Sequence, residues 1–329
     1  MKVGVFSCKS YDRKFLIAGN HNYGFELHFI ECGLSAETVL LARPYDAVSV
    51  FVDDIVDANV LDALAKLEIN HIALRCPGYA NIDLEHARKR DITVSRVPSY
   101  TPASVAEHTV ALILALNRKL YKAYNRVIES NFDLEGLLGF NLKGRTVGVI
   151  GVGKIGSALI KILNGFGCEV LCSDPIPSAE IEALGARYVA LPELFQQADI
   201  ISLHCPLTEQ TRHIIDHKAI QQMKDNVMII NTSQGGLLNI KAILTGLKSR
   251  KIGYFGLDIY DMKSELLPHD QFHETFSLDT CQRLSTFPNV MITGHQGFFT
   301  DKSMQLIADT TLRNLQCFFA GKVNQETFL

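Results

Sequence analysis

The sequence predicts an α/β protein built from two doubly wound domains with parallel sheets, and three observations carry this prediction. Short runs of β-branched and apolar residues alternate with longer helical stretches through most of the 329 residues. One such run, at 146–150, leads directly into a glycine-rich turn and a helical pattern. A longer helical pattern at 101–127 separates a first set of runs from a second.

The first set of expected strands precedes residue 100. These runs are VGVFS (3–7), FELHFI (25–30), AVSVFV (47–52), HIALR (71–75) and ITVSR (92–96). Pro102 then opens a stretch with apolar residues at spacings of three and four, which predicts one long helix over 101–127. We expect this helix to join the two domains, and its apolar excess could serve a subunit interface.

The second set of expected strands follows that helix. Its runs are TVGVI (146–150), EVLCS (169–173), ADIISLH (198–204), VMIIN (227–231), GYFGLD (253–258) and VMITG (290–294). A closing helix is expected at 301–321, folding back onto the first domain. The predicted domains are therefore 1–100 with 299–329, and 101–298.

Composition argues against several classes of partner. The chain is 47% hydrophobic and 20% charged with a net charge of −3, so no basic surface indicates nucleic acid or an anionic membrane. No stretch approaches the roughly 18 apolar residues of a membrane span, and the N-terminal MKVGVFSCKSYDRK is typical of a first strand rather than a signal peptide. Eight cysteines without a CxxC pair favour a cytoplasmic protein with reduced thiols. His269 and His273 have no third ligand in sequence, so no metal site is predicted.

The glycine-rich turn carries the strongest functional pattern. Gly151, Gly153 and Gly156 have the G-x-G-x-x-G spacing between a strand and a helix, with Lys154 and Ile155 inside the motif. Such glycines let the backbone approach a pyrophosphate at the helix N-terminus. Asp174 ends the next strand, where a carboxylate can bind the adenosine ribose hydroxyls and would repel a 2′-phosphate. The sequence therefore predicts NAD rather than NADP.

Ligands of open α/β sheets bind beyond the carboxyl ends of the strands, so polar residues at those ends are candidates. His295 is the best candidate for a general acid–base, because imidazole alone titrates near neutrality unaided. Cys205 could be a reactive thiol or could pack against the cofactor, and we favour packing. The strand ends to consider are His204-Cys205-Pro206, 231–236 with Thr232 and Ser233, Asp258, and 294–296.

Several segments together resemble the D-2-hydroxyacid dehydrogenases, most closely the bacterial D-lactate dehydrogenases. The resemblance covers essentially the whole chain. It rests on RCPGYANIDL (75–84), VPSYTPASVAEHTVALIL (97–114), VGVIGVGKIG (147–156), SLHCPLTEQTRHII (202–215), INTSQGGLLN (230–239), GLDIYD (256–261) and TGHQGFFT (293–300). It implies a flavodoxin-like catalytic domain, a Rossmann NAD-binding domain, a homodimer or homotetramer, and hydride transfer between NADH and a 2-oxo acid such as pyruvate.

The resemblance also implies a substrate pocket. Backbone amides around Cys76, Pro77 and Gly78 would hold the substrate carboxylate, and Gly78 would allow its close approach. His295 fits the family's proton donor. Tyr100 and Phe298 would shape the pocket, while Asp258 and Thr232 would lie near the nicotinamide.

Two of the three expected catalytic groups differ from the family pattern. Gln234 stands where the family has an arginine that clamps the carboxylate, and Lys263 stands where a glutamate pairs with the histidine. A neutral amide loses the bidentate, charged fork of arginine, and a cation near His295 disfavours its protonated form. Glu265 could replace the missing glutamate.

Three explanations fit these replacements. Lys263 could supply the missing cation in a rearranged site. The chain could be an inactive relative that binds NAD(H) as a sensor or partner-binding protein. The enzyme could also act on another 2-oxo acid. The sequence favours an NAD-dependent D-2-hydroxyacid dehydrogenase of the D-lactate type, with the sensor as the alternative.

Overall fold

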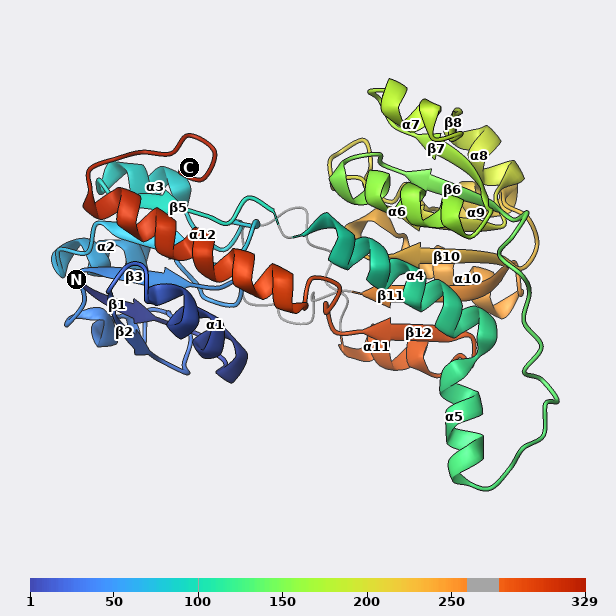
Figure 1. Cartoon of the computed structure of the whole chain (residues 1–329), viewed down its shortest axis with the longest axis horizontal. Helices are drawn as coiled ribbons and strands as arrows, with labels where there is room; N and C mark the ends of the chain where they lie inside the picture. Colours follow the sequence, from blue (N-terminus) through green and yellow to red (C-terminus); the bar gives the residue numbers. More distant parts are fainter. Residues whose placement is uncertain (100, 259–277) are drawn as a thin grey trace. The chain divides into compact units, whose positions relative to one another are not determined.

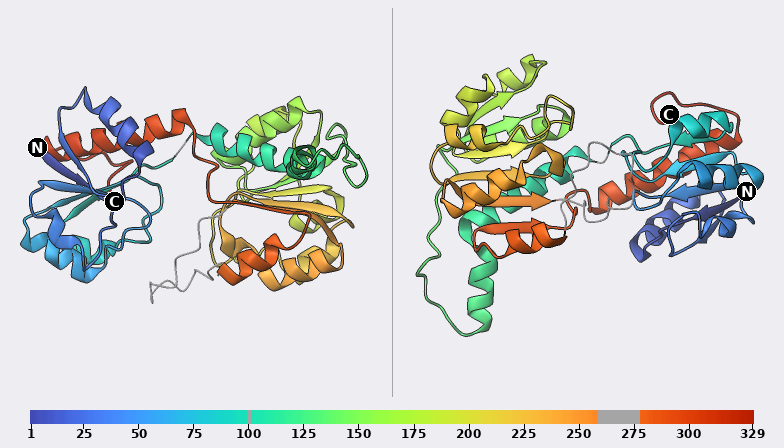
Figure 2. Two further views of the ribbon diagram at one scale, coloured as in Figure 1. Left: turned by 90° about the horizontal axis from the view of Figure 1, so that it is seen from below. Right: turned by 180° about the vertical axis from the view of Figure 1, so that it is seen from behind.

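The computed structural model describes residues 1–99, 101–258 and 278–329, and the chain divides into two compact units. Unit 1 comprises Met1–Thr101 with Phe299–Leu329, and unit 2 comprises Pro102–Phe298 (Figure 1). Each unit contains one parallel sheet with helices on both faces (Figure 2). The predicted fold class, two doubly wound α/β sheets, is confirmed.

Unit 1 has a five-stranded sheet in the order β2-β1-β3-β4-β5, the flavodoxin-like order. The strands are β1 (Lys2–Val5), β2 (Glu26–Phe29), β3 (Ala47–Val50), β4 (His71–Leu74) and β5 (Thr93–Ser95). The helices are α1 (Ser10–Asn20), η1 (Val39–Ala42), α2 (Ala58–Lys66), α3 (Leu84–Lys89) and α12 (Asp301–Phe319). Helices α1 and α12 pack together over one face of the sheet, so the C-terminal helix does fold back onto the first domain.

Unit 2 has a seven-stranded sheet in the order β12-β11-β10-β9-β6-β7-β8. The strands are β6 (Thr146–Ile150), β7 (Glu169–Ser173), β8 (Arg187–Tyr188), β9 (Ile200–Leu203), β10 (Val227–Asn231), β11 (Ile252–Asp258) and β12 (Val290–Thr293). The helices are α4 (Pro102–Arg118), α5 (Leu120–Ile128), α6 (Lys154–Gly165), α7 (Ala179–Ala183), α8 (Leu191–Gln197), α9 (His217–Gln222), η2 (Gly235–Leu237), α10 (Ile240–Lys248) and α11 (Leu278–Ser285). The strand order reverses between β6 and β9, which is where doubly wound sheets bind dinucleotides.

Burial on both faces explains why the strands were visible in the sequence. Every residue of β3 and of β10 is buried. A parallel strand covered by helices on both sides must be apolar continuously rather than alternately. The two-residue β8 escaped prediction because it is too short for such a run.

The helix predicted over 101–127 is not continuous, and this prediction was wrong. Lys119 adopts the left-handed conformation (φ 49°) and separates α4 from α5. Asn117 exchanges two hydrogen bonds of 2.8 Å with the backbone of Phe140, which ties the end of α4 to a later segment. Many apolar side chains of α4 serve the core of unit 2, whereas α5 has no buried residue.

In the described residues, no helix combines the length and the apolar character that crossing a bilayer requires.

Candidate functional site

The glycine turn after β6 has a geometry that only glycine satisfies at two positions. Gly151 has φ +92°, and a Cβ there would lie 2.4 Å from the amide nitrogen of Cys205. A Cβ on Gly156 would lie 2.2 Å from the carbonyl oxygen of Gly151. The first glycine makes the turn, and the third lets α6 pack closely against it.

The second glycine of the motif faces open space. Gly153 is the N-cap of α6, just before Lys154 and Ile155, and a Cβ there would meet nothing within 4 Å. Free space beside the first turn of a helix suits a phosphate, because unpaired amides and the helix dipole both favour an anion there.

Asp174 lies just beyond β7, next to the same turn. Its Oδ2 accepts a hydrogen bond of 2.7 Å from the amide of Val152, and its Oδ1 accepts one of 2.9 Å from the amide of Ile176. The carboxylate is therefore held at the glycine turn, half-buried and within reach of a ligand. These residues fit the diphosphate and ribose of a dinucleotide.

At the end of β9, His204 and Cys205 are held in neutral forms. The Nε2 of His204 lies 2.7 Å from the Oγ of Ser202, and burial lowers the pKa of His204 to about 4. Burial raises the pKa of Cys205 to about 11. A thiol that stays protonated at neutral pH is a poor nucleophile, so the packing role of Cys205 fits better than the reactive one. Pro206 follows, exposed.

The turn after β10 is fixed by hydrogen bonds of its own side chains. Asn231 donates from Nδ2 to the carbonyl oxygen of Gln234 (2.9 Å) and accepts at Oδ1 from the amide of Ser233 (2.9 Å). The Oγ of Ser233 donates to the carbonyl of Cys205 (3.1 Å), and the hydroxyls of Thr232 and Thr109 lie 2.9 Å apart. Gln234 itself has extended backbone and an exposed side chain.

Asp258, the last residue of β11, is buried among donors. Its carboxylate accepts hydrogen bonds from the Oγ1 of Thr293 (2.6 Å) and from the amides of Gln296 (2.9 Å) and Gly297 (2.8 Å). The Nε2 of His108 lies 3.6 Å from the same carboxylate. Burial alone would raise the pKa of Asp258, but these donors outweigh it and hold the pKa well below its usual range.

His295 lies at the end of the segment that Asp258 fixes. Its backbone is in the left-handed region (φ 52°), which is costly for a residue with a side chain. The two amides that follow it are those bound by Asp258, and its half-buried ring lies 5.9 Å from the ring of Phe298. The carboxylate therefore maintains the strained backbone that presents this imidazole.

His108 and Thr293 belong to this cluster although sequence reasoning did not select them. The Nε2 of His108 lies 3.1 Å from the Oγ1 of Thr293. His108 was one polar residue within an apolar helical pattern, and nothing in the sequence indicates that α4 passes the end of β11.

In unit 1, the predicted carboxylate-binding residues follow β4. Cys76 is buried, and the amides of Cys76 and Gly78 donate to no acceptor in the described part of the chain. Pro77 has no amide hydrogen, so its expected contribution as a donor must be corrected. Two predicted substrate or catalytic residues, Tyr100 and Lys263, lie outside the described residues, as does Glu265.

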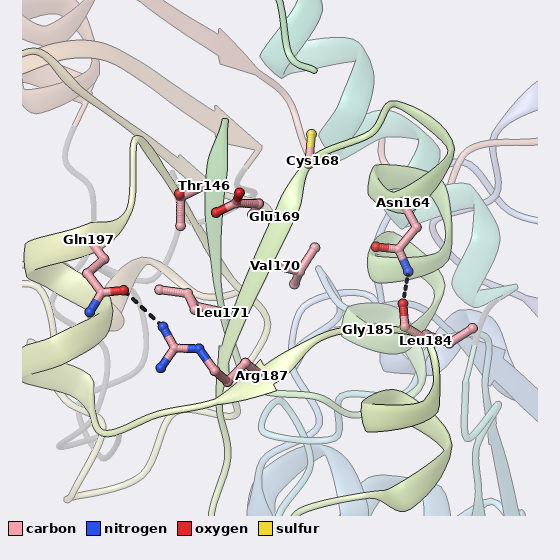
Figure 3. A pocket seen from close by; sticks show the side chains of 10 residues that line it. All are labelled: Thr146, Asn164, Cys168, Glu169, Val170, Leu171, Leu184, Gly185, Arg187 and Gln197. Carbon is pink, nitrogen blue, oxygen red and sulfur yellow. Dashed lines mark hydrogen bonds between the residues drawn. The ribbon is translucent and has the colours of Figure 1, made fainter. Parts of the chain in front are cut away.

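A surface hollow of about 530 Å³ lies elsewhere in unit 2 (Figure 3). Its lining includes Thr146, Glu169 and Arg187, the first residues of β6, β7 and β8. It is thus at the amino ends of the strands, the edge opposite the glycine turn. Some of its polar groups bind one another: Arg187 bonds Gln197, and Asn164 bonds the carbonyl of Leu184. None of the predicted site residues lines it.

Within the ranges that the structure describes, no group of three His, Cys, Asp or Glu side chains could hold a metal ion. His269 and His273 lie outside those ranges.

Comparison with known proteins agrees with this geometry. A family model for the "D-isomer specific 2-hydroxyacid dehydrogenase, NAD binding domain" matches residues 110–297. The D-lactate dehydrogenase of Escherichia coli is 45% identical over 322 residues, which span 98% of this chain and 98% of the relative. The apo-structure of D-lactate dehydrogenase from Escherichia coli superposes with a TM-score of 0.92 at 43% identity and covers 99% of each chain.

A structure with bound NAD+ is also similar. The D-lactate dehydrogenase from Lactobacillus jensenii with NAD+ has a TM-score of 0.81 and 32% identity, covering 99% of this chain and 98% of that one. NAD is the cofactor that both the family model and the glycine turn indicate. The family expected from the sequence motifs is confirmed: the chain belongs to the D-isomer specific 2-hydroxyacid dehydrogenases.

Proposed function

We propose that the protein is an NAD-dependent D-2-hydroxyacid dehydrogenase of the D-lactate type that reduces a 2-oxo acid, with pyruvate as the default substrate. The observation that carries the proposal is the Asp258 cluster, which fixes the backbone beside His295 at a strand end of the NAD-binding domain. Burying a carboxylate costs desolvation free energy, which hydrogen bonds must offset. An arrangement of this kind next to a histidine favours a functional role for that histidine.

The proposed reaction uses the residues that the sequence motifs selected. NADH, when bound, supplies the hydride that goes to the carbonyl carbon. His295 donates a proton to the carbonyl oxygen, and the amides of Cys76 and Gly78 bind the carboxylate. Tyr100 and Phe298 shape the pocket, and Thr232 with Asp258 supports the nicotinamide side.

Gln234 does not supply the positive charge that the family's arginine provides in this mechanism. Charge-assisted hydrogen bonds contribute roughly 1.5–3 kcal/mol, so a neutral amide in place of arginine lowers activity by about tenfold to a few hundredfold. Lys263 or a polar group of a different 2-oxo acid could compensate. This replacement is the observation that favours the second candidate, an NAD(H)-binding sensor or partner-binding protein without turnover.

The deciding experiment is NADH oxidation by the purified protein at several pH values, with pyruvate and a panel of larger 2-oxo acids. Turnover well above background supports the dehydrogenase, and the preferred acid names the substrate class. NADH binding without turnover on any acid contradicts the dehydrogenase and supports the sensor.

We also propose that the protein self-associates through α5 and the segment after it. Leu120, Tyr124, Val127 and Ile128 lie on one face of α5 and are between 53% and 69% exposed. Figure 1 shows that α5 and the chain leading away from it project from the rest of unit 2. The following segment exposes more apolar side chains, namely Phe132, Leu134 and Leu138.

The charges of α5 and of the segment after it are complementary between two copies of the chain. The helix is basic and the following segment is acidic, so two copies in opposite orientation would pair unlike charges. The basic residues are Lys119, Lys122 and Arg126, and the acidic ones are Glu129, Asp133 and Glu135.

Sedimentation velocity tests this proposal. The variant Tyr124→Glu/Val127→Glu should sediment as a smaller species than the wild type, while Leu40→Glu, at an exposed leucine of unit 1, should not. A wild-type monomer, or equal effects of both variants, would contradict it.

We also propose a cytoplasmic location, which the eight free thiols support.

A further inference from the structure

The loop at residues 76–79, the carboxylate loop, has its carbonyl acceptors in use for hydrogen bonds and leaves its amide donors available. The carbonyl oxygen of Gly78 accepts from the Sγ of Cys76 (3.2 Å), and that of Tyr79 accepts from the amide of Ile82 (3.1 Å). The carbonyl oxygen of Pro77 accepts from an Nη of Arg96 (2.9 Å). The amides of Cys76, Gly78 and Tyr79 donate to no acceptor within the described residues.

Arg96 reaches this loop from a firmly held backbone. It follows β5, and its amide donates to the carbonyl of Thr327 (2.7 Å). Its own carbonyl accepts from the Nδ2 of Asn314 on α12 (2.9 Å). The guanidinium also lies over the ring of Tyr79, 5.1 Å from the centroid. One side chain therefore contacts two successive parts of the loop, a carbonyl and a ring.

Within the described ranges, no carboxylate contacts Arg96 and neutralises its charge. The Arg96 side chain contacts the Pro77 carbonyl and the Tyr79 ring but forms no ion pair with an acidic side chain of those ranges, and its Nε is buried without a hydrogen-bond partner there. A cation without a paired anion, beside a row of unused amides, stabilises a bound anion.

We propose that Arg96 is a positioning residue for the substrate carboxylate. It fixes the carboxylate loop through Pro77 and Tyr79, and it adds a positive charge to the loop that carries the amides of Cys76 and Gly78. This inference rests on the proposed dehydrogenase function. It also gives the site one cation that does not depend on position 234.

Kinetics of Arg96→Gln and Arg96→Lys test the consequence for the reaction. In Arg96→Gln we expect KM for the 2-oxo acid to rise on the order of tenfold, with kcat changed less than about twofold and NADH affinity unaltered. Arg96→Lys keeps the charge but loses the planar guanidinium that stacks on Tyr79. Its KM should therefore lie between those of the wild type and Arg96→Gln. Arg90→Gln is the matched control, since Arg90 is half-exposed in the same unit and bonds Asp62.

Alkylation of Cys76 by iodoacetamide, followed peptide by peptide with mass spectrometry, tests the hold on the loop without requiring turnover. Cys76 is 2% exposed, and burial raises its pKa to about 12, so it should react very slowly in the wild type. Arg96→Gln should accelerate its alkylation several-fold. Cys8, which is 6% exposed in the same unit, should react at an unchanged rate.

The outcomes separate the two proposals. Active wild type with an unchanged KM in Arg96→Gln, or unchanged Cys76 alkylation, overturns the role of Arg96 alone. Equal acceleration at Cys8 and Cys76 shows general loosening of unit 1 and overturns it too. Wild type that binds NADH but neither reduces any acid nor binds oxamate contradicts the dehydrogenase function itself.

Discussion

Gln234 has a fixed backbone and an exposed side chain, so its position tolerates a larger residue. Its backbone carbonyl accepts a hydrogen bond from Asn231, while its side chain is exposed. The opposite holds for Asp258, whose carboxylate is bound by three donors. Gln234, which departs from the family pattern, is therefore at a position with few structural constraints. Asp258, which follows the pattern, is at a position with many.

Gln234→Arg should raise kcat/KM for a 2-oxo acid by about tenfold to a few hundredfold, because a charged, bidentate donor replaces a neutral amide. The measurement is steady-state NADH oxidation with pyruvate, in parallel with the wild type. Gln222→Arg, at an exposed glutamine of α9, controls for the added charge and should have little effect. An unchanged kcat/KM in Gln234→Arg would show that this position does not face the substrate.

Three glycines in and next to helix α6 differ in whether they serve packing, ligand binding or neither. Of its glycines, Gly156 packs against the turn, Gly153 caps the helix beside open space, and Gly165 ends the helix on the surface. These three environments predict three different results for the same chemical change.

Gly156→Ala should lower the free energy of unfolding by about 2–3 kcal/mol, since its Cβ would overlap the carbonyl of Gly151.

Gly153→Ala should change the free energy of unfolding by no more than about 1 kcal/mol. It should nevertheless weaken NADH binding by roughly tenfold or more, because the methyl group would occupy the space proposed for the phosphate. Gly165→Ala, where nothing lies within 4 Å, should preserve both properties. Urea unfolding and NADH fluorescence titration measure the two effects. Tight NADH binding by Gly153→Ala would refute the assigned phosphate position.

In the described residues, burial keeps His71 of unit 1 and His204 of unit 2 neutral. In unit 1, His71 lies between Phe318 and Phe328, with ring centroids 4.3 and 5.5 Å away, and bonds the hydroxyls of Thr93 and Ser95. Burial lowers its pKa to about 3. In unit 2, burial lowers the pKa of His204 to about 4. Both units should therefore lose stability as the solution becomes acidic.

The direction follows from proton linkage. An unfolded histidine titrates near 6.5, so between about pH 6.5 and pH 4 the unfolded state binds protons that the folded state excludes. Lowering the pH from 7 to 5 should cost about 2 kcal/mol for each buried histidine. Hydrogen exchange of amides in β3 and β10 reports the two units separately. His71→Phe should flatten the pH dependence in β3 and leave that in β10, and equal pH dependence in β3 of both proteins would disprove the assignment.

The parallel strands, the glycine turn and the family motifs could be read from the sequence, because each is local. A buried parallel strand is apolar along its length, and a dinucleotide turn requires glycines at set intervals. These patterns sufficed for the fold class and the cofactor, and they selected Asp174 and His295, whose roles stay predictions. They also placed Gln234 at a strand end.

Tertiary structure decided what depends on contacts between distant segments. The long helix is interrupted at Lys119, two residues after Asn117, which bonds Phe140, and helical propensity does not indicate that bond. His108 joins Asp258 only because α4 passes the end of β11. Arg96 reaches Pro77 only because β5 lies beside β4. Sequence periodicity carries each segment's own conformation, whereas the partner of a side chain far along the chain is determined only when the sheets and helices pack.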